Sequence, residues 1–410
     1  MVRQMVKDQV AAWIDLHTEA QTAFLVHLVQ RPSDNPPGDC APHAEMTATL
    51  LEEMGFTVER HVVPSTVARQ HGMQSVMNLI VRERFGTGPT VALNAHGDVV
   101  PPGDGWSVDP YAAVIEDNWL IGRGAAVSKS DFATYAFALR ALKAVAAPLN
   151  GSIELHLTYD EETGGLAGPQ WLLQQGLTYP DFAICAAFSH HVTTAHNGCL
   201  HLQITLHGMS AHAARPDTGH DAIEAGTRLL NALYHYRDTL VERRSSVTGI
   251  TSPTMIVGTI HGGINTNVVP DTLTLRIDRR IIPEEDPASV EAELREVVQQ
   301  ALANMIGITY KVDTVLLAKP FRPVGDAGRL AQIVCDQASI ALGETVTQIG
   351  VPLYTDARLY AEVGVPTVMY GAGPRSLLEA NGHRADERLP LAMLPVATKA
   401  IAWSLIELLS

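Results

Sequence analysis

The sequence predicts an α/β protein in which a mixed sheet flanked by helices is interrupted by an inserted α+β domain. Its 410 residues exceed what one hydrophobic core usually serves, so two domains are expected. Helical and strand patterns alternate in the first half of the chain. This rhythm changes near residue 194 and returns after residue 316, which predicts a discontinuous domain of residues 1–193 and 317–410 around an insertion of residues 194–316.

The periodicity of apolar residues places the elements of the first domain in order. Helices are predicted at residues 10–29, 44–54 and 132–145, and strands at 57–63, 78–82, 90–95, 152–158 and 181–186. His96 and Glu161 then lie just beyond the carboxyl ends of two strands. Open α/β sheets keep their ligand sites at this edge, so a functional site is expected there.

The insertion has a different order of elements. Strands are predicted at residues 201–206, 254–260, 272–277 and 309–315, with helices at 221–241 and 287–304. Such an arrangement is typical of a small α+β domain. After residue 320 the helix and strand alternation of the first domain resumes and includes His383. A site that joins His96, Glu162 and His383 requires both flanking segments to form one domain.

Composition excludes several classes of protein. The formal charge of −15 and the lack of a concentrated basic face argue against a nucleic-acid partner. No apolar run is long enough to span a bilayer and the first residues lack an apolar signal core, so no membrane partner and a cytoplasmic location are expected. The four cysteines lack CxxC spacing, which indicates buried thiols rather than a thiolate zinc site or a disulfide scaffold.

Two short motifs suggest metal-dependent chemistry. In His96-Gly97-Asp98 an imidazole can bind a metal while the acidic neighbour fixes its tautomer and aim. In Glu161-Glu162 one carboxylate can bind the metal while the other takes a proton from metal-bound water. Each motif alone is weak, because His-Gly-Asp is common in turns and a Glu pair is usually a solvated face.

The order of the motifs strengthens this interpretation. The same chain carries, in sequence, Gly122-Arg123-Gly124-Ala125, Gly208-Met209-Ser210-Ala211-His212, Asn267-Val268-Val269-Pro270, Thr355-Asp356-Ala357-Arg358 and Asn381-Gly382-His383. From about residue 40 onward the sequence resembles the zinc metallopeptidase family of aminoacylase, acetylornithine deacetylase, succinyl-diaminopimelate desuccinylase and glutamate carboxypeptidase. The resemblance implies a catalytic domain with an inserted domain that dimerises or closes as a lid, and therefore a homodimer.

The resemblance also implies roles for single residues. It makes His96, Glu162 and His383 metal ligands, Asp98 the carboxylate that orients His96, and Glu161 the general base. His212 resembles a histidine that stabilises the developing oxyanion in a neighbouring subunit's site, and its alternative is a polar residue flanking a helix. Asn267 and Arg280 match positions that hold polar substrate groups, often a carboxylate. The alternative for Arg280 is a surface ion pair with the nearby Glu284 and Glu285.

Two departures from the family pattern decide the expected metal content. The family's bridging Asp is replaced by Val127, and a second ligating carboxylate falls on Ala187. A bridging carboxylate offsets the repulsion of two cations, and valine cannot. The expectation is therefore one divalent ion per chain, held by two histidines and one carboxylate, with Zn or Mn favoured and Co or Fe also compatible. Asp131, His190 and His191 are candidate replacement ligands, although a helix-cap Asp and polar loop histidines are the favoured interpretation.

The favoured function is metal-dependent hydrolysis of a C–N bond by Glu161-assisted attack of metal-bound water. The substrate expected from the resemblance is a small molecule, an N-acyl amino acid or a small peptide-like amide. Two alternatives stay open. One is an aminohydrolase that displaces an amine from an activated carbon, such as one of an aromatic ring, with a single metal. The other is a non-catalytic small-molecule-binding relative, against which the retained Glu161 argues, because binding alone gives no reason to keep a base beside a ligand.

Overall fold

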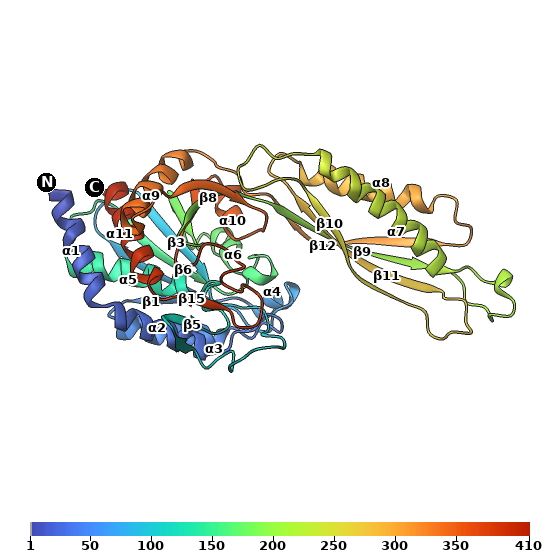
Figure 1. Cartoon of the computed structure of the whole chain (residues 1–410), viewed down its shortest axis with the longest axis horizontal. Coiled ribbons are helices and arrows are strands. Elements are labelled where there is room, and N and C mark those ends of the chain that lie inside the picture. The colour runs from blue at the N-terminus through green and yellow to red at the C-terminus, as the bar shows by residue number, and fades with distance from the viewer. Residues whose placement is uncertain (1) are drawn as a thin grey trace. The chain divides into compact units, whose positions relative to one another are not determined.

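Residues 2–410 are described by a computed structural model of the whole chain (Figure 1). They divide into two units. Unit 1 comprises Met1–Thr194, Pro323–Ile349 and Thr355–Ser410, and unit 2 comprises Ala195–Arg322 and Gly350–Tyr354. The predicted class, an α/β fold with a mixed sheet flanked by helices and a further α+β part, is confirmed. Among residues 2–410 no helix is both long and apolar enough to cross a membrane.

An eight-stranded mixed sheet organises unit 1. Its strands run in the order β1, β2, β6, β3, β7, β14, β8, β13. Their bounds are β1 Val58–Val62, β2 Met77–Arg84, β3 Thr90–His96, β6 Ser152–Thr158, β7 Phe182–Cys185, β8 His191–His196, β13 Thr347–Val351 and β14 Thr367–Met369. The central block β6, β3, β7 and β14 is parallel, so these four strands end at one edge of the sheet. A small antiparallel sheet is formed by β4 Val114–Glu116, β5 Trp119–Ile121 and β15 Arg388–Pro390.

Helices from both ends of the chain pack around this sheet. They are α1 Val2–Leu16, α2 Thr18–Gln30, α3 Ala41–Glu53, α4 Ser65–Gln70, α5 Lys129–Ala144, α6 Pro169–Gln174, α9 Ala327–Leu342, α10 Ala357–Glu362 and α11 Met393–Leu409. Helix α5 contacts β3, β6 and α11, and α11 contacts α9. The segments before and after unit 2 therefore share one core, which brings the late histidine segment into the same domain as β3 and β6.

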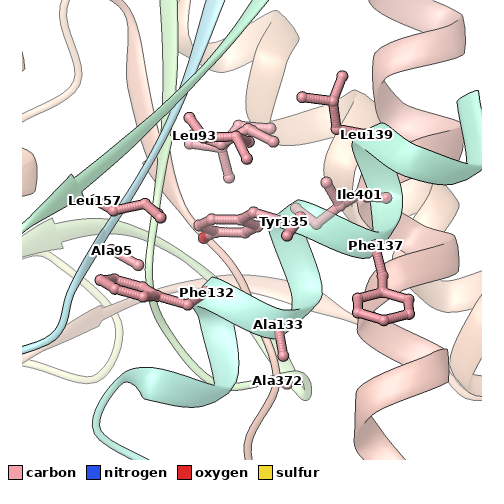
Figure 2. Packing of buried hydrophobic residues seen from close by; sticks show 14 of the residues in the cluster. Leu93, Ala95, Phe132, Ala133, Tyr135, Phe137, Leu139, Leu157, Ala372 and Ile401 are labelled. Atoms are coloured by element: carbon pink, nitrogen blue, oxygen red, sulfur yellow. The ribbon is translucent and has the colours of Figure 1, made fainter. Parts of the chain in front are cut away.

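The core beside the sheet is filled by α5 (Figure 2). Phe132 and Tyr135 lie fully buried among Leu93, Ala95 and Leu157 of the parallel strands. Burying an aromatic side chain of this size stabilises the fold by roughly 1.5–3 kcal/mol. This packing fixes α5 and, with it, the loop that precedes it, against the carboxyl edge of the sheet.

Unit 2 is a four-stranded antiparallel sheet with two long helices. The strands β9 Gly198–His207, β10 Thr254–Gly262, β11 Thr272–Ile281 and β12 Thr309–Ala318 run in the order β10, β11, β9, β12. Helices α7 Ala222–Thr239 and α8 Pro287–Leu302 bury their apolar faces against alternate residues of β9 and β11, including Leu202 and Leu275. Each helix begins at an aspartate whose carboxylate accepts backbone N–H bonds, Asp221 and Asp286.

One predicted helix is wrong. Residues 10–29 form the end of α1 and most of α2, which are separated at His17. The His17 ring stacks on Trp13 with ring centroids 3.8 Å apart, and its Nδ1 donates to the Trp13 carbonyl at 2.7 Å. The chain turns here without a Gly or Pro, so the apolar period continues across the break and conceals it in the sequence.

Candidate active site

The parallel block of unit 1 brings His96 and Glu161 to the same edge of the sheet. His96 is the last residue of β3 and is paired in register with Thr158, the last residue of β6. Three residues further on, Glu161 opens a short 3-10 helix, Glu161–Thr163. The two predicted motifs are thus neighbours because β3 and β6 are adjacent and parallel.

The side chain of His96 is buried and held in one orientation. Its Nδ1 lies 2.9 Å from the backbone carbonyl oxygen of Asp98 and 3.4 Å from Asp98 Oδ1. Because a carbonyl oxygen only accepts, Nδ1 carries a proton and donates it, which leaves Nε2 as the ligand atom. Nε2 faces Glu161 Oε2 at 4.0 Å. The geometry agrees with a histidine aimed for metal binding.

Glycine is required between His96 and Asp98. A Cβ at Gly97 would lie 2.4 Å from Tyr159 Cε1 and 3.0 Å from the ring of Phe132. Tyr159 directly follows β6, and Phe132 belongs to α5. The absence of a side chain at Gly97 therefore lets the His-Gly-Asp segment pack directly against these two aromatic rings.

Asp98 links the two motifs. Its side chain is fully buried and accepts hydrogen bonds from the backbone N–H groups of Glu161 and Glu162, both at 3.2 Å. The amide of Asn35 donates a further bond to Asp98 Oδ2 at 2.9 Å. Asp98 thus fixes the turn that carries both glutamates as well as the ring of His96.

Glu162 and His383 face each other. Glu162 Oε1 lies 3.3 Å from His383 Nε2. This oxygen is buried and accepts no hydrogen bond from residues 2–410. A buried carboxylate favours a positively charged partner, and His383 is the one that the structure places beside it. His383 sits in a loop with left-handed backbone (φ 61°), which is closed by a bond from Asn381 Nδ2 to the Asp386 carbonyl at 3.1 Å.

The electrostatics of the site favour positive charge. One ligand atom from each of His96, Glu161 and Glu162 lies within 4.8 Å of the others. Although burial lowers the pKa of His96, Asp98, Glu161 and Glu162 raise it well above the ordinary value. The carboxylate of Glu162 likewise raises the pKa of His383. Both imidazoles are thus set among negative charges, as expected for residues that hold a cation.

Glu161 is a carboxyl group that can both take up and release a proton near neutral pH. Burial raises its pKa to about 8, and the negative charges of Glu162, Asp98 and Asp160 add to this effect. His96 opposes it. A general base works best when its pKa lies near the working pH.

Val127 and Ala187 offer no metal-binding atoms. Val127 precedes α5, and its N–H donates to Glu387 Oε1 at 3.0 Å. The same oxygen accepts from Ala126 N–H at 3.1 Å, and the other carboxylate oxygen of Glu387 binds Arg123 at 2.6 Å in a fully buried ion pair. The backbone at Val127, where the resemblance implies a bridging carboxylate, is therefore held by Glu387.

The candidate replacement ligands make other contacts. Asp131 does not cap α5; it is fully buried, and its Oδ1 accepts from Ala372 N–H at 2.7 Å. His190 pairs with Glu344 at 2.8 Å. His191 begins β8, and burial lowers its pKa. None of the three belongs to the group formed by His96, Glu161 and Glu162.

The remaining predicted residues lie in unit 2. His212 is exposed, and its Nδ1 accepts from Ala214 N–H at 3.0 Å, so its proton is on Nε2. Asn267 is on the exposed neighbouring segment, where its carbonyl accepts from Ala213 N–H at 3.0 Å. Arg280 does not pair with Glu284 or Glu285 as its alternative interpretation expected. It binds Asp278 at 3.0 Å instead.

Comparison with known proteins identifies the family. The model of peptidase family M20/M25/M40 matches residues 92–406. The chain belongs to this peptidase family. It is therefore a relative of metallohydrolases that act on amide or peptide bonds.

Individual members of the M20 family are similar along most of the chain. Succinyl-diaminopimelate desuccinylase of Methylobacterium nodulans is 31% identical over 398 residues, which cover 92% of this chain and 93% of that protein. Acetylornithine deacetylase of Photorhabdus laumondii is 34% identical over 242 residues, 58% of this chain and 60% of that protein. The Bacillus subtilis YxeP protein, a dinuclear metal-binding peptidase of the M20 family, has the same fold with a TM-score of 0.68 at 16% identity, over 96% of this chain and 99% of that one.

Sequence reasoning missed several residues that shape this M20 site. Asn35 and Glu387 support Asp98 and the Val127 backbone from distant parts of the chain. Asp160 and Asp356 are buried carboxyl groups, and burial raises the pKa of each; the charge of Asp356 adds to this effect for Asp160, and the charge of Glu161 adds to it for Asp356. The only available signals were the positions of Asp356 and Asp160 inside motifs already noted, Thr355-Asp356-Ala357-Arg358 and Asp160-Glu161-Glu162.

Proposed function

We propose that this M20 member is a metal-dependent hydrolase that cleaves the amide bond of an N-acyl amino acid or a small peptide-like substrate. The observation that carries the proposal is the convergence of His96, Glu161 and Glu162 within 4.8 Å, with His383 Nε2 3.3 Å from Glu162 Oε1. Family membership and the names of the relatives support the class of bond.

His96, Glu162 and His383 are the residues that would hold one divalent ion. The buried Glu162 Oε1, beside His383, and His96 Nε2, the ring nitrogen that does not face the Asp98 carbonyl, fit this role. Two imidazoles and one carboxylate suit Zn or Mn and leave positions open for other ligands. When bound, the ion supplies Lewis acidity, which polarises a carbonyl group and lowers the pKa of water. With Val127 and Ala187 in place of carboxylates, a second ion beside it would lack the two carboxylates that the family pattern provides to offset the repulsion.

Glu161 is the proposed acid–base residue. Its carboxylate takes a proton from the attacking water and, once protonated, passes that proton to the departing nitrogen. The pKa of about 8 supports the second step, because a protonated carboxyl is then available near neutral pH. Asp98 acts as a positioning residue, since it holds the N–H groups of the turn that carries Glu161.

Unit 2 is the proposed source of substrate contacts. His212 carries its proton on Nε2, so it can donate a hydrogen bond to an oxyanion. The fork of Arg280 and the amide of Asn267 suit a substrate carboxylate. Following the family pattern, we expect these residues to act in a homodimer, with His212 serving the partner's site.

The proposal is tested with three proteins: wild type, Glu161→Gln and Glu162→Ala. A panel of N-acetyl and N-succinyl amino acids and dipeptides is assayed for free amine, and bound metal is measured by elemental analysis. We expect Glu161→Gln to keep its metal while kcat falls by about 10²–10⁴, the usual contribution of a general base. Glu162→Ala is expected to lose one ion per chain together with activity.

A matched control and the opposing results complete the test. Glu53→Gln changes an exposed glutamate at the end of α3 and should leave both kcat and metal content unchanged. Undiminished turnover in Glu161→Gln would remove Glu161 from the mechanism. Release of ammonia from an unacylated substrate, with no amide cleaved on the panel, would overturn the proposal in favour of an aminohydrolase.

A further inference from the structure

A second cluster of metal-binding side chains lies in unit 2, on neighbouring strands of its sheet. Cys199 and His201 are two residues apart on β9, and Asp278 on β11 is paired in register with His201. Their side chains lie on the face of the sheet opposite to Leu200 and Leu202, which pack in the apolar core of unit 2. One thiol, one imidazole and one carboxylate therefore project from adjacent positions of a rigid sheet.

The distances between these groups match a coordination shell. Cys199 Sγ lies 3.1 Å from His201 Nε2 and 3.6 Å from Asp278 Oδ1, and Asp278 Oδ2 lies 3.3 Å from the same Nε2. In a tetrahedral zinc site, bonds of about 2.3 Å to sulfur and 2.0–2.2 Å to nitrogen and oxygen place the corresponding atoms roughly 3.6, 3.6 and 3.4 Å apart. The three distances are thus within about half an ångström of these values, although the sulfur faces Oδ1 and the ring nitrogen faces Oδ2, so the carboxylate would turn to offer one oxygen to the ion.

The chemistry of the contact favours a metal over hydrogen bonds alone. Both the thiol and the carboxylate approach the same ring nitrogen of His201. One nitrogen can share only one proton at a time, so when Nε2–H donates to Asp278 Oδ2 and the thiol donates to Oδ1, the 3.1 Å approach of the sulfur to Nε2 has no hydrogen bond of its own. A nucleophile, imidazole and carboxylate relay would instead use opposite ring nitrogens, so the geometry does not fit that arrangement.

The surroundings support a charged carboxylate at this point. Burial alone would raise the pKa of Asp278, but the hydrogen bond to His201 and the charge of Arg280 lower it. Arg280 Nη2 donates to Asp278 Oδ2 at 3.0 Å, which leaves Oδ1 directed to the sulfur. Carboxylate ligands of metals are commonly held by such outer hydrogen bonds. His201 is 35% exposed, so ions can reach the cluster although Cys199 is fully buried.

We propose that Cys199, His201 and Asp278 form a binding site for one zinc ion in unit 2, with a fourth position open to water or a small ligand. Soft thiolate and imidazole ligands select zinc over the hard cations Mg²⁺ and Ca²⁺. None of its three ligands is assigned to the active site, although Arg280, which we propose to contact substrate, also holds the carboxylate of Asp278. It also changes how metal content is interpreted, because two ions per chain would then arise without a dinuclear active site.

The test uses Co²⁺ as a spectroscopic substitute for zinc. The metal-free full-length protein is titrated with Co²⁺, and the thiolate-to-cobalt charge-transfer absorption in the near ultraviolet is recorded. We expect one equivalent of Co²⁺ per chain to develop this band and Zn²⁺ to abolish it. The proposed active-site ligands include no cysteine, so His383→Ala should keep the band whether or not the proposed function is correct.

Matched variants show which cysteine provides the thiolate that binds Co²⁺. Cys199→Ser should lose the band, whereas Cys335→Ser, which removes another buried thiol, should retain it. His201→Gln should weaken Co²⁺ binding at least tenfold, whereas His207→Gln, at the exposed end of the same strand, should not. His201 is partly exposed, so its variant serves if Cys199→Ser does not fold. Absence of the band from wild type, or its persistence in Cys199→Ser, would overturn the proposal and leave a hydrogen-bonded cluster only.

Discussion

Replacing Asp98 by Asn tests whether one buried carboxylate organises the active site. The wild-type carboxylate accepts bonds from Asn35 Nδ2 at 2.9 Å and from the N–H groups of Glu161 and Glu162 at 3.2 Å. Asparagine has the same shape, but one of its two acceptor atoms becomes an NH₂ group. Whichever way the amide turns, that group faces at least one N–H donor, so a buried donor loses its partner.

The expected loss follows from these contacts. Leaving one buried donor unpaired costs about 1–3 kcal/mol, and bonds to a charged acceptor lie at the upper end. We therefore expect Asp98→Asn to lower the free energy of unfolding of unit 1 by about 3 kcal/mol, a fall in Tm of roughly 5 °C for a unit of this size. Displacement of the glutamate turn should also weaken metal binding by about 10–100-fold, as for other residues that orient ligands.

Calorimetry of the metal-free proteins and titration with Zn²⁺ measure these two effects separately. Asp104→Asn, at an exposed position, is the matched control and should leave both unchanged. If Asp98→Asn melts within 1 °C of wild type and binds zinc equally well, Asp98 does not organise the site and the reasoning fails.

Three further predictions concern stability and metal dependence. Burial alone would raise the pKa of Glu154, but hydrogen bonds such as the one from His156 at 2.9 Å lower it from 4.5 to about 2. Glu154→Gln should therefore lower the free energy of unfolding by about 3 kcal/mol above pH 4.5. Urea unfolding should show the difference between wild type and variant shrinking as the pH falls from 4.5 towards 2. A difference that stays constant over this range would contradict the prediction. Gly97→Ala places a Cβ 2.4 Å from Tyr159 and should lower the free energy of unfolding by about 1–3 kcal/mol in the same assay. The control is Gly328→Ala, whose added Cβ has no atom within 4 Å and which should stay within about 1 kcal/mol of wild type. Equal effects of the two substitutions would refute the steric argument. Chelation should abolish amide hydrolysis, and Zn²⁺ or Mn²⁺ should restore it while Ca²⁺ should not, because imidazole ligands disfavour hard cations; rescue by Ca²⁺ would argue against the assigned ligands.

Most helices and strands, and the positions of His96 and Glu161, could be predicted from the sequence. Strand periodicity placed His96 and Glu161 just beyond strand ends, and the parallel pairing of β3 and β6 makes such ends neighbours. The helix break at His17 was not predictable, because a ring stacked on Trp13 and a bond to its carbonyl cause it while the apolar pattern continues. Local patterns report local burial, and they do not report such specific side-chain contacts.

By itself, the sequence determined the α/β class and the family motifs, and it placed Val127 and Ala187 where the resemblance implies ligating carboxylates. Only the tertiary structure decided that Asp98 binds the N–H groups of Glu161 and Glu162, and that His383 lies 3.3 Å from Glu162 Oε1. The structure alone also brings together Cys199, His201 and Asp278, which looked like scattered residues in the sequence. The hydrophobic period and the order of motifs can be read from neighbouring residues in the sequence. A site is made by contacts between segments that are distant in sequence, and the packing of the whole fold sets those contacts.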